Sequence, residues 1–419
     1  MHLVENKEPR FFYGYVVVAI VFCILLVAWG IFLSFGVFFE PVLTEFGWTR
    51  AATSGAFSLA FLVMGSLGVG VGRLTDRFGP RPVMTGCGLF LGLGFLLMPQ
   101  ISAIWQLYLF YGVIIGIGMS ATWVPANSII PRWFVKRRGL MTGIVLNGNG
   151  VGVIIMPPIA RWLISTYGWR VAYSVVGIIA LVLIVFAAQF LKREPSQVGQ
   201  LPYGADEVKS ESSGLKVRGF SLGEAIRTKP FWLLCAISFC IWLCVGTVMV
   251  HIVIHATGLG ISAASATSIL VIIGGVSIAG RAIMGGIADK IGNKSALIVS
   301  FIIMSASFFW LMVAREKWML YLFGVILGFG YGALSPLVSP LVAELFGLSS
   351  HGAIFGVTFL WGTIGEAIGP VVAGGIFDVI GGYQWAFLLC AAISIIGIIF
   401  SSLLRPTNGL PPAPPTSRI

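Results

Sequence analysis

The segments GRLTDRFGPR (72–81) and GGIADKIGNK (285–294) are two copies of one loop pattern, 213 residues apart. Each copy follows a long apolar stretch and is followed by another. The same offset relates further pairs of residues: Gly143 and Gly356, and Pro157 and Pro370. A register that holds across most of each half predicts that the chain folds as two related units.

The composition indicates a protein that spans a membrane. Of the 419 residues, 58% are hydrophobic and only 10% are charged, whereas soluble domains contain roughly 25% charged residues. No water-soluble fold of this length hides so much apolar surface, but a lipid bilayer accommodates it. The net charge of +11 is distributed by loop rather than gathered on one face, so we expect no nucleic-acid partner.

Twelve stretches are long enough to cross the hydrocarbon core, which takes about 20 apolar residues each. They are 13–39, 51–73, 82–100, 105–130, 139–165, 169–191, 231–256, 263–287, 295–314, 318–345, 352–377 and 383–404. The predicted fold is an all-α membrane protein with two pseudo-symmetric six-helix bundles. The predicted domains are the first bundle (1–191), a polar linker (192–230), the second bundle (231–405) and a proline-rich disordered tail (406–419).

The distribution of Lys and Arg predicts the orientation. With both termini inside, 20 of the 26 Lys and Arg residues fall in cytoplasmic segments, as the positive-inside rule requires. The run after residue 12 is read as the first span rather than a signal peptide, because no cleavage site of small residues follows it. The expected location is a bacterial inner membrane, with both termini cytoplasmic.

The repeated loop pattern resembles the signature loop of the major facilitator superfamily. Glycines in the pattern permit close helix approach, and each aspartate stands at a helix end, where it can pair with the adjacent cation or with a cation on a neighbouring helix. The residues of this predicted latch are Gly72, Asp76 and Arg77 in the first copy, and Gly285, Asp289 and Lys290 in the second. The alternative is that these loops only set topology, which needs cations but has no use for repeated aspartates.

Three shorter stretches resemble the monocarboxylate transporters, the lactate/pyruvate proton symporters. They are YGYVVV (13–18), PRWFVKRRGLMTGIVLNGNGVG (131–152) and GRAIMGGIAD (280–289). The last is similar to that family's eighth helix, which carries a substrate-binding arginine. The resemblance implies that Arg281 holds a substrate carboxylate and that a proton accompanies it.

The residues around Arg281 support this interpretation on physical grounds. Arg281 is the only cation deep inside a predicted span, and it lies roughly 12 Å of helix before Asp289 at about 1.5 Å per residue. A buried guanidinium is costly and normally faces a cavity or a partner, and its planar fork suits a carboxylate. The alternative is a structural ion pair with Glu344 or Glu366.

The proton route of animal-type relatives does not transfer to this chain. Those relatives carry an aspartate one turn before the arginine and a lysine in the first span, where this chain has Ser277 and Leu33. Three ionisable groups in predicted spans are candidates for proton coupling: Glu366, His251 and His255. The alternatives are that Glu366 is structural, that the histidines are interfacial, or that the acid crosses protonated and needs no carrier.

Further cavity residues come from the helices that line the path in this fold. Trp29 and Leu33 are expected to supply an apolar wall, and Asn127, Asn147 and Tyr331 to bond a hydroxyl or keto group; packing between helices is the alternative role of each. Because so few polar groups accompany the one arginine, the sequence favours a small, partly apolar anion as the substrate.

Other classes of function are disfavoured. An oxalate/formate-type anion exchanger is the leading alternative, although a dicarboxylate calls for a second cation in the cavity. A membrane enzyme requires clustered catalytic side chains, and of the four histidines His2 and His351 fall in predicted surface segments. No P-loop pattern occurs, so ATP-driven transport is not expected, and no metal, cofactor or catalytic residue is predicted.

Overall fold

The computed structural model describes residues 11–205 and 219–405. All regular elements in these ranges are helices. The first half contains α1 (Gly14–Leu33), α2 (Phe35–Phe46), α3 (Arg50–Phe78), α4 (Pro80–Leu97), α5 (Ile104–Leu107), the π-helix η2 (Tyr108–Ile115), α6 (Gly116–Trp133) and α7 (Arg138–Gln189). The linker contributes the short η3 (Pro195–Val198) and α9 (Leu222–Ala225).

The second half repeats this pattern. Its helices are α10 (Lys229–Gly258), α11 (Ala263–Ile291), α12 (Asn293–Val313), α13 (Lys317–Leu334), α14 (Val338–Phe346), α15 (His351–Ile380) and α16 (Gln384–Leu403). Equivalent helices begin at equivalent residues: α7 starts at Arg138 and α15 at His351, again 213 residues later. The central part of the predicted linker (206–218) and the predicted tail (406–419) lie outside the described residues.

The number of membrane crossings agrees with the predicted fold. Eleven helices of the described ranges are long and apolar enough to span a membrane. One of them, α7, has 52 residues and bends at Gly168, whose φ of 81° and ψ of 161° are not helical. Since Gly168 divides α7 into two spans, the described ranges contain twelve candidate spans, and the all-α membrane fold is confirmed.

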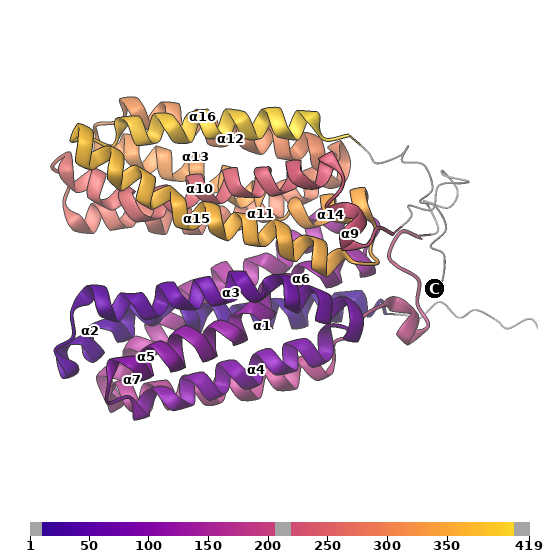
Figure 1. The fold of residues 1–419 in the computed structure, drawn as a ribbon, viewed down its shortest axis with the longest axis horizontal. Coiled ribbons are helices and arrows are strands. Elements are labelled where there is room, and N and C mark those ends of the chain that lie inside the picture. The colour runs from indigo at the N-terminus through magenta and orange to yellow at the C-terminus, as the bar shows by residue number, and fades with distance from the viewer. Residues whose placement is uncertain (1–10, 206–218, 406–419) are drawn as a thin grey trace, which may run out of the picture.

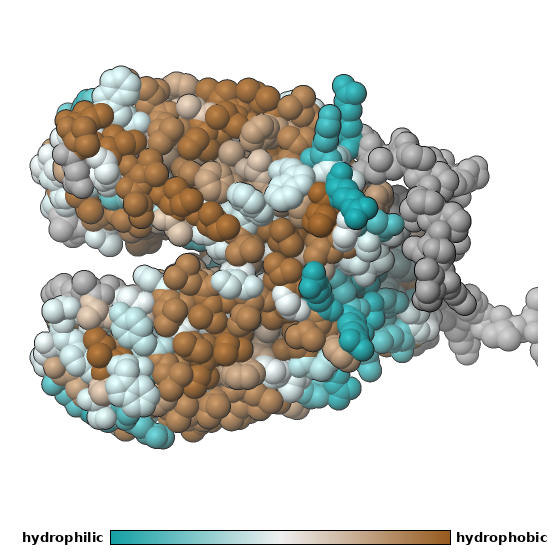
Figure 2. All heavy atoms as spheres, in the orientation of Figure 1, coloured by the Kyte–Doolittle hydropathy of each residue, from teal (hydrophilic) through white to brown (hydrophobic). Residues whose placement is uncertain are grey.

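The two halves form two layers of helices that run side by side along the molecule (Figure 1). The linker segments lie at one end, which we call the linker end (Figure 1), and Gln200 of the linker binds the Phe11 carbonyl there. There the layers touch, while a cleft separates them at the opposite, open end (Figure 2). Apolar side chains cover the flanks between the two ends (Figure 2), as expected for a surface that faces lipid.

Glycines allow the halves to meet at the linker end. A Cβ atom on Gly72 of α3 would overlap the carbonyl oxygen of Gly352 on α15, and one on Gly285 of α11 would overlap that of Gly139 on α7. Each contact therefore joins one half to the other, backbone against backbone. The cleft closes at one end because small residues occupy both sides of it there.

Candidate functional site

Arg281 lies on α11 at the boundary between the halves. Its side chain is 3% exposed, and its guanidinium carbon lies 5.6 Å from the centre of the Tyr331 ring on α13. Nε and Nη1 have no hydrogen-bond partner among the described residues. A guanidinium held over an aromatic face and without a bonded anion is prepared to receive one.

The two carboxylates considered as partners of Arg281 lie elsewhere. Glu344 accepts a hydrogen bond of 2.6 Å from Nδ2 of Asn293. Glu366, on α15, packs against Gly246 of α10. Among the described side chains, no carboxylate approaches Arg281 within ion-pair distance. The described geometry thus contains no internal counter-charge for this cation.

Helix α7 of the first half forms the opposite side of the Arg281 site. Gly143 packs against the Arg281 carbonyl, and a Cβ on Gly150 would lie 3.3 Å from Nη1 of Arg281. Asn147, between these glycines, donates from Nδ2 to the carbonyl of Ile278 at 3.0 Å, which leaves its Oδ1 without a partner. Arg281 and Asn147 therefore lie on facing helices of the two halves.

Aromatic rings continue from Tyr331 toward the first half. Trp242 lies 6.0 Å from Tyr331, Trp123 lies 6.4 Å from Trp242, and Trp29 lies 5.5 Å from Trp123. A cavity of about 30 Å³ adjoins Trp123, Trp242 and Tyr331, room for about one water molecule. Nε1 of Trp29 is buried without a partner, so this predicted apolar wall also presents one free donor.

The remaining predicted cavity residues have other neighbours. Asn127 donates to the carbonyl of Trp123 at 2.9 Å, and its own carbonyl accepts a hydrogen bond from Ser339 of α14. Its backbone thus joins the halves. Ser277 donates to Gly274 within α11 at 2.7 Å, and Leu33 is partly buried against the core.

The candidates for proton coupling lie on α10 and α15, and the two histidines share Tyr383 as a neighbour. His251 is bonded on both ring nitrogens, to the Tyr383 hydroxyl at 3.1 Å and to the Pro370 carbonyl at 2.9 Å. His255, one turn further along α10, packs on Phe387, and its Nε2 has no partner. Glu366 is half-buried between α15 and α10. These three groups do not form one cluster with Arg281.

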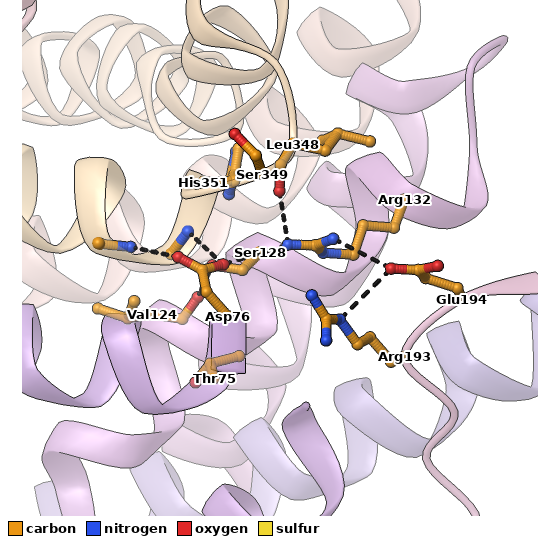
Figure 3. Close-up of polar contacts among 12 residues, drawn as sticks. Thr75, Asp76, Val124, Ser128, Arg132, Arg193, Glu194, Leu348, Ser349 and His351 are labelled. Carbon is orange, nitrogen blue, oxygen red and sulfur yellow. Dashed lines mark hydrogen bonds and ion pairs between the residues drawn. The ribbon is translucent and has the colours of Figure 1, made fainter. Parts of the chain in front are cut away.

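The first copy of the loop pattern caps a helix of the opposite half (Figure 3). Asp76, at the end of α3, accepts hydrogen bonds from the backbone N–H groups of Gly352 at 3.0 Å and Ala353 at 2.9 Å. These are first-turn donors of α15, whose own N-cap residue, Ser350, makes no side-chain cap. A carboxylate at this position satisfies free donors and complements the helix dipole.

The second copy repeats the arrangement in the reverse direction. Asp289 of α11 accepts from the N–H groups of Gly139 at 2.8 Å and Leu140 at 3.0 Å. These belong to the first turn of α7, whose N-cap, Arg137, also lacks a side-chain cap. Sequence reasoning missed these partners, although the equivalence of Gly139 and Gly352 at the 213-residue offset was a visible signal.

The cation that pairs with Asp76 lies on a neighbouring helix rather than beside it in the sequence. Nη2 of Arg132, on α6, lies 3.1 Å from Oδ1 of Asp76 and donates to the carbonyl of Leu348 at 2.7 Å. Arg132 also pairs with Glu194 of the linker at 3.4 Å (Figure 3). Arg77 instead lies over the ring of Phe78, and no ion pair joins Lys290 to Asp289 among the described residues.

The assignment of His351 to a surface segment was wrong. Its side chain is fully buried at the start of α15, where Nε2 lies 3.0 Å from the Ser339 carbonyl. The reason is tertiary: α15 begins against α14 of its own half and against Asp76 and Arg132 of the first half (Figure 3), so its first residue is buried.

Comparison with known proteins identifies similar sequences along most of the chain. The family model of the Major Facilitator Superfamily matches residues 20–316 and 256–418. Monocarboxylate transporter 13 of Rattus norvegicus is 26% identical over 409 residues, which cover 94% of this chain and 89% of that protein. Monocarboxylate transporter 2 of Homo sapiens is 25% identical over 410 residues, covering 94% and 86%.

A bacterial relative and two solved structures are also similar to this chain. The uncharacterized MFS-type transporter YhjX of Escherichia coli (strain K12) is 28% identical over 319 residues, covering 74% of this chain and 76% of that protein. The proton:xylose symporter XylE superposes with a TM-score of 0.72 at 13% identity, covering 93% and 95% of the two chains. FucP in the outward conformation gives 0.69 at 16% identity, covering 93% and 99%.

Proposed function

The chain belongs to the Major Facilitator Superfamily, and from that premise we propose that it carries a small monocarboxylate such as L-lactate or pyruvate together with a proton. As a member of this superfamily it is a multi-pass membrane transporter and not an enzyme. We further propose that the linker end faces the cytoplasm of a bacterium, since most of the cations are assigned to that side.

The observation that carries the proposal is the buried, unpaired guanidinium of Arg281. Its free donors, the Tyr331 ring beneath it and the unpartnered Oδ1 of Asn147 suit a carboxylate that bears a nearby hydroxyl group. Burying a lone cation is unfavourable, so an anionic cargo stabilises the site by supplying the missing charge. The similarity to monocarboxylate transporters 13 and 2 favours the same cargo.

The proposed transport cycle alternates between two closures of one cleft. In the conformation described, Asp76 and Asp289 hold the linker end shut and the open end gives access to the cleft. Release of these caps would open the linker end, while the halves close at the other. We propose no dedicated proton carrier at Arg281, because Ser277 and Leu33 replace the ionisable residues of the relatives.

Uptake into proteoliposomes tests the coupling. We expect labelled lactate or pyruvate to enter several-fold faster when the external buffer is acidic, because a proton accompanies each anion. A protonophore that collapses the gradient is expected to remove the stimulation. Uptake that ignores the pH gradient and requires an internal anion would instead assign the protein to anion exchange.

Substitution of the central cation tests the site. Arg281→Gln is expected to lower lactate uptake by about 100-fold, equivalent to ~3 kcal/mol, because hydrogen bonds to a charged group are lost. The matched control is Arg161→Gln, which removes an exposed arginine of α7. Normal uptake by Arg281→Gln, at equal expression, would remove Arg281 from the binding site.

A further inference from the structure

At the open end, the first half holds a carboxylate of its own. Glu45 of α2 receives hydrogen bonds from Nε1 of Trp169 at 2.7 Å and Nη1 of Arg170 at 2.8 Å, and its Oε1 pairs with Nη2 of Arg170 at 2.6 Å. Arg170 is fixed in turn by the Pro99 carbonyl. Three segments thus surround one carboxylate: the end of α2, the loop after α4, and the turn at Gly168.

The second half has the same three segments without the carboxylate. The 213-residue offset places Gly258 where Glu45 stands, and Gly381 where Gly168 stands. Gly168 and Gly381 both have positive φ, 81° and 77°, although their ψ values of 161° and 17° differ, so a glycine turns the chain at both places in different conformations. Without a side chain at residue 258, the corner is an open depression of about 770 Å³, lined by Gly258, Gly381 and Gly382 among others.

The depression presents positive charge and hydrogen-bond donors. Arg315, in the loop between α12 and α13, lines it and forms no ion pair with any described side chain. The N-terminus of α16 opens onto it through Gln384 and Trp385, and the N-cap residue makes no side-chain cap. First-turn amides of a 20-residue helix attract anions.

A buried histidine provides the independent sign of a ligand site. His255 lines the depression, is 9% exposed, and has no partner for Nε2 among the described residues. Its neighbour His251 is bonded on both nitrogens, so of the two histidines only the one that lines the depression has an unpartnered ring nitrogen. A buried polar atom without a partner calls for one.

We propose that this depression is a second anion site, which binds a small carboxylate from solution at the place where the first half carries its own Glu45. The identity of the carboxylate as the cargo rests on the function proposed above. Bound there, at the open end of the half that carries Arg281, the anion is concentrated at the mouth of the cleft before it enters.

Thiol modification tests the site without relying on transport. The variant Cys23→Ser/Arg281→Gln/Gln384→Cys places a reactive thiol in the depression, removes the exposed native cysteine and disables the central site. In nanodiscs, an anionic methanethiosulfonate is expected to react faster than its cationic analogue. Replacing chloride by lactate at constant ionic strength is expected to slow the anionic reagent about threefold.

Two further variants decide the outcome. Added to the same background, Arg315→Gln is expected to abolish both the charge preference and the protection by lactate. Lys317→Gln, which removes a nearby cation stacked on Tyr321, is expected to preserve both. The proposed site would be refuted if lactate did not protect the thiol at residue 384, or if it protected that thiol equally with and without Arg315→Gln. If lactate protects the thiol but the wild-type protein does not transport lactate, the second anion site stands and the proposed cargo is rejected.

Discussion

Asp76 and Asp289 occupy equivalent positions, but their surroundings differ. Both accept two backbone N–H groups from the opposite half. Within the described ranges, only Asp76 also forms an ion pair, with Arg132, and that arginine binds the Leu348 carbonyl of the second half as well. Removing Asp76 therefore leaves the largely buried Arg132 with only its longer ion pair to Glu194 of the linker, which costs more than losing the cap alone.

This asymmetry yields a prediction at the residue scale. Asp76→Ala is expected to favour opening of the linker end by about 2 kcal/mol, roughly 30-fold in population, and Asp289→Ala by about 1 kcal/mol, roughly fivefold. Distances between spin labels on the two halves at the linker end measure these populations. Equal shifts for the two variants would show that the ion pair with Arg132 contributes nothing.

At the scale of elements, Glu45 fastens α2 to the second part of α7. Both side chains of the Glu45–Arg170 pair are partly exposed, 40% and 43%. Hydrogen bonds from the Arg170 guanidinium and the Trp169 ring lower the pKa of Glu45 below its usual value. A carboxyl group whose pKa is lowered by folding stabilises the folded state above its unfolded pKa, roughly 4.3, and loses that contribution as the pH falls through its folded pKa.

The corresponding prediction concerns thermal stability in detergent. Glu45→Gln is expected to lower Tm at pH 7, and the difference from the wild type is expected to shrink as the pH falls below about 4.3. High salt is expected to reduce the difference at pH 7, because the pair is exposed. A Tm difference that is constant from pH 7 to pH 3 would contradict a role for the charged form of Glu45.

At the scale of the whole molecule, closure of the linker end is a contact between rigid halves. Its contacts are backbone-to-backbone approaches at Gly72, Gly139 and their partners, with the two aspartate caps beside them. In the proposed cycle, one relative rotation of the halves would break both caps, because they are equivalent under the internal repeat. The aromatic contact between Trp123 of the first half and Trp242 of the second lies beside the 30 Å³ cavity. The same motion would separate these two rings.

A crosslink across this contact is expected to stop transport. Leu140 on α7 and Gly286 on α11 face each other, since a Cβ on Gly286 would lie 3.7 Å from the Leu140 side chain. In Leu140→Cys/Gly286→Cys, a short reducible thiol crosslinker is expected to abolish uptake, and reduction to restore it. Leu140→Cys alone, treated alike, is the control. Undiminished uptake by the crosslinked protein would refute alternating closure at the linker end.

The sequence alone determined the membrane fold, the number of crossings and the internal repeat, because each depends on local composition or on spacing along the chain. A run of about 20 apolar residues has few alternatives to a spanning helix. The 213-residue register likewise marked Asp76 and Asp289 as a pair. The depth of Arg281 in its helix followed from counting residues back from Asp289.

The partners of these residues were decided by tertiary structure alone. The amides that bind Asp76 and Asp289, the burial of His351, and the contrast between Glu45 and the open corner at Gly258 all depend on which segments meet. Apolar helices of similar hydropathy pack in many ways within lipid, so the hydrophobic pattern that predicts their existence carries little information on their neighbours. Backbone donors at helix ends are not encoded by any one residue type, so although the repeat pairs Gly139 with Gly352, it does not show which carboxylates bind their amides.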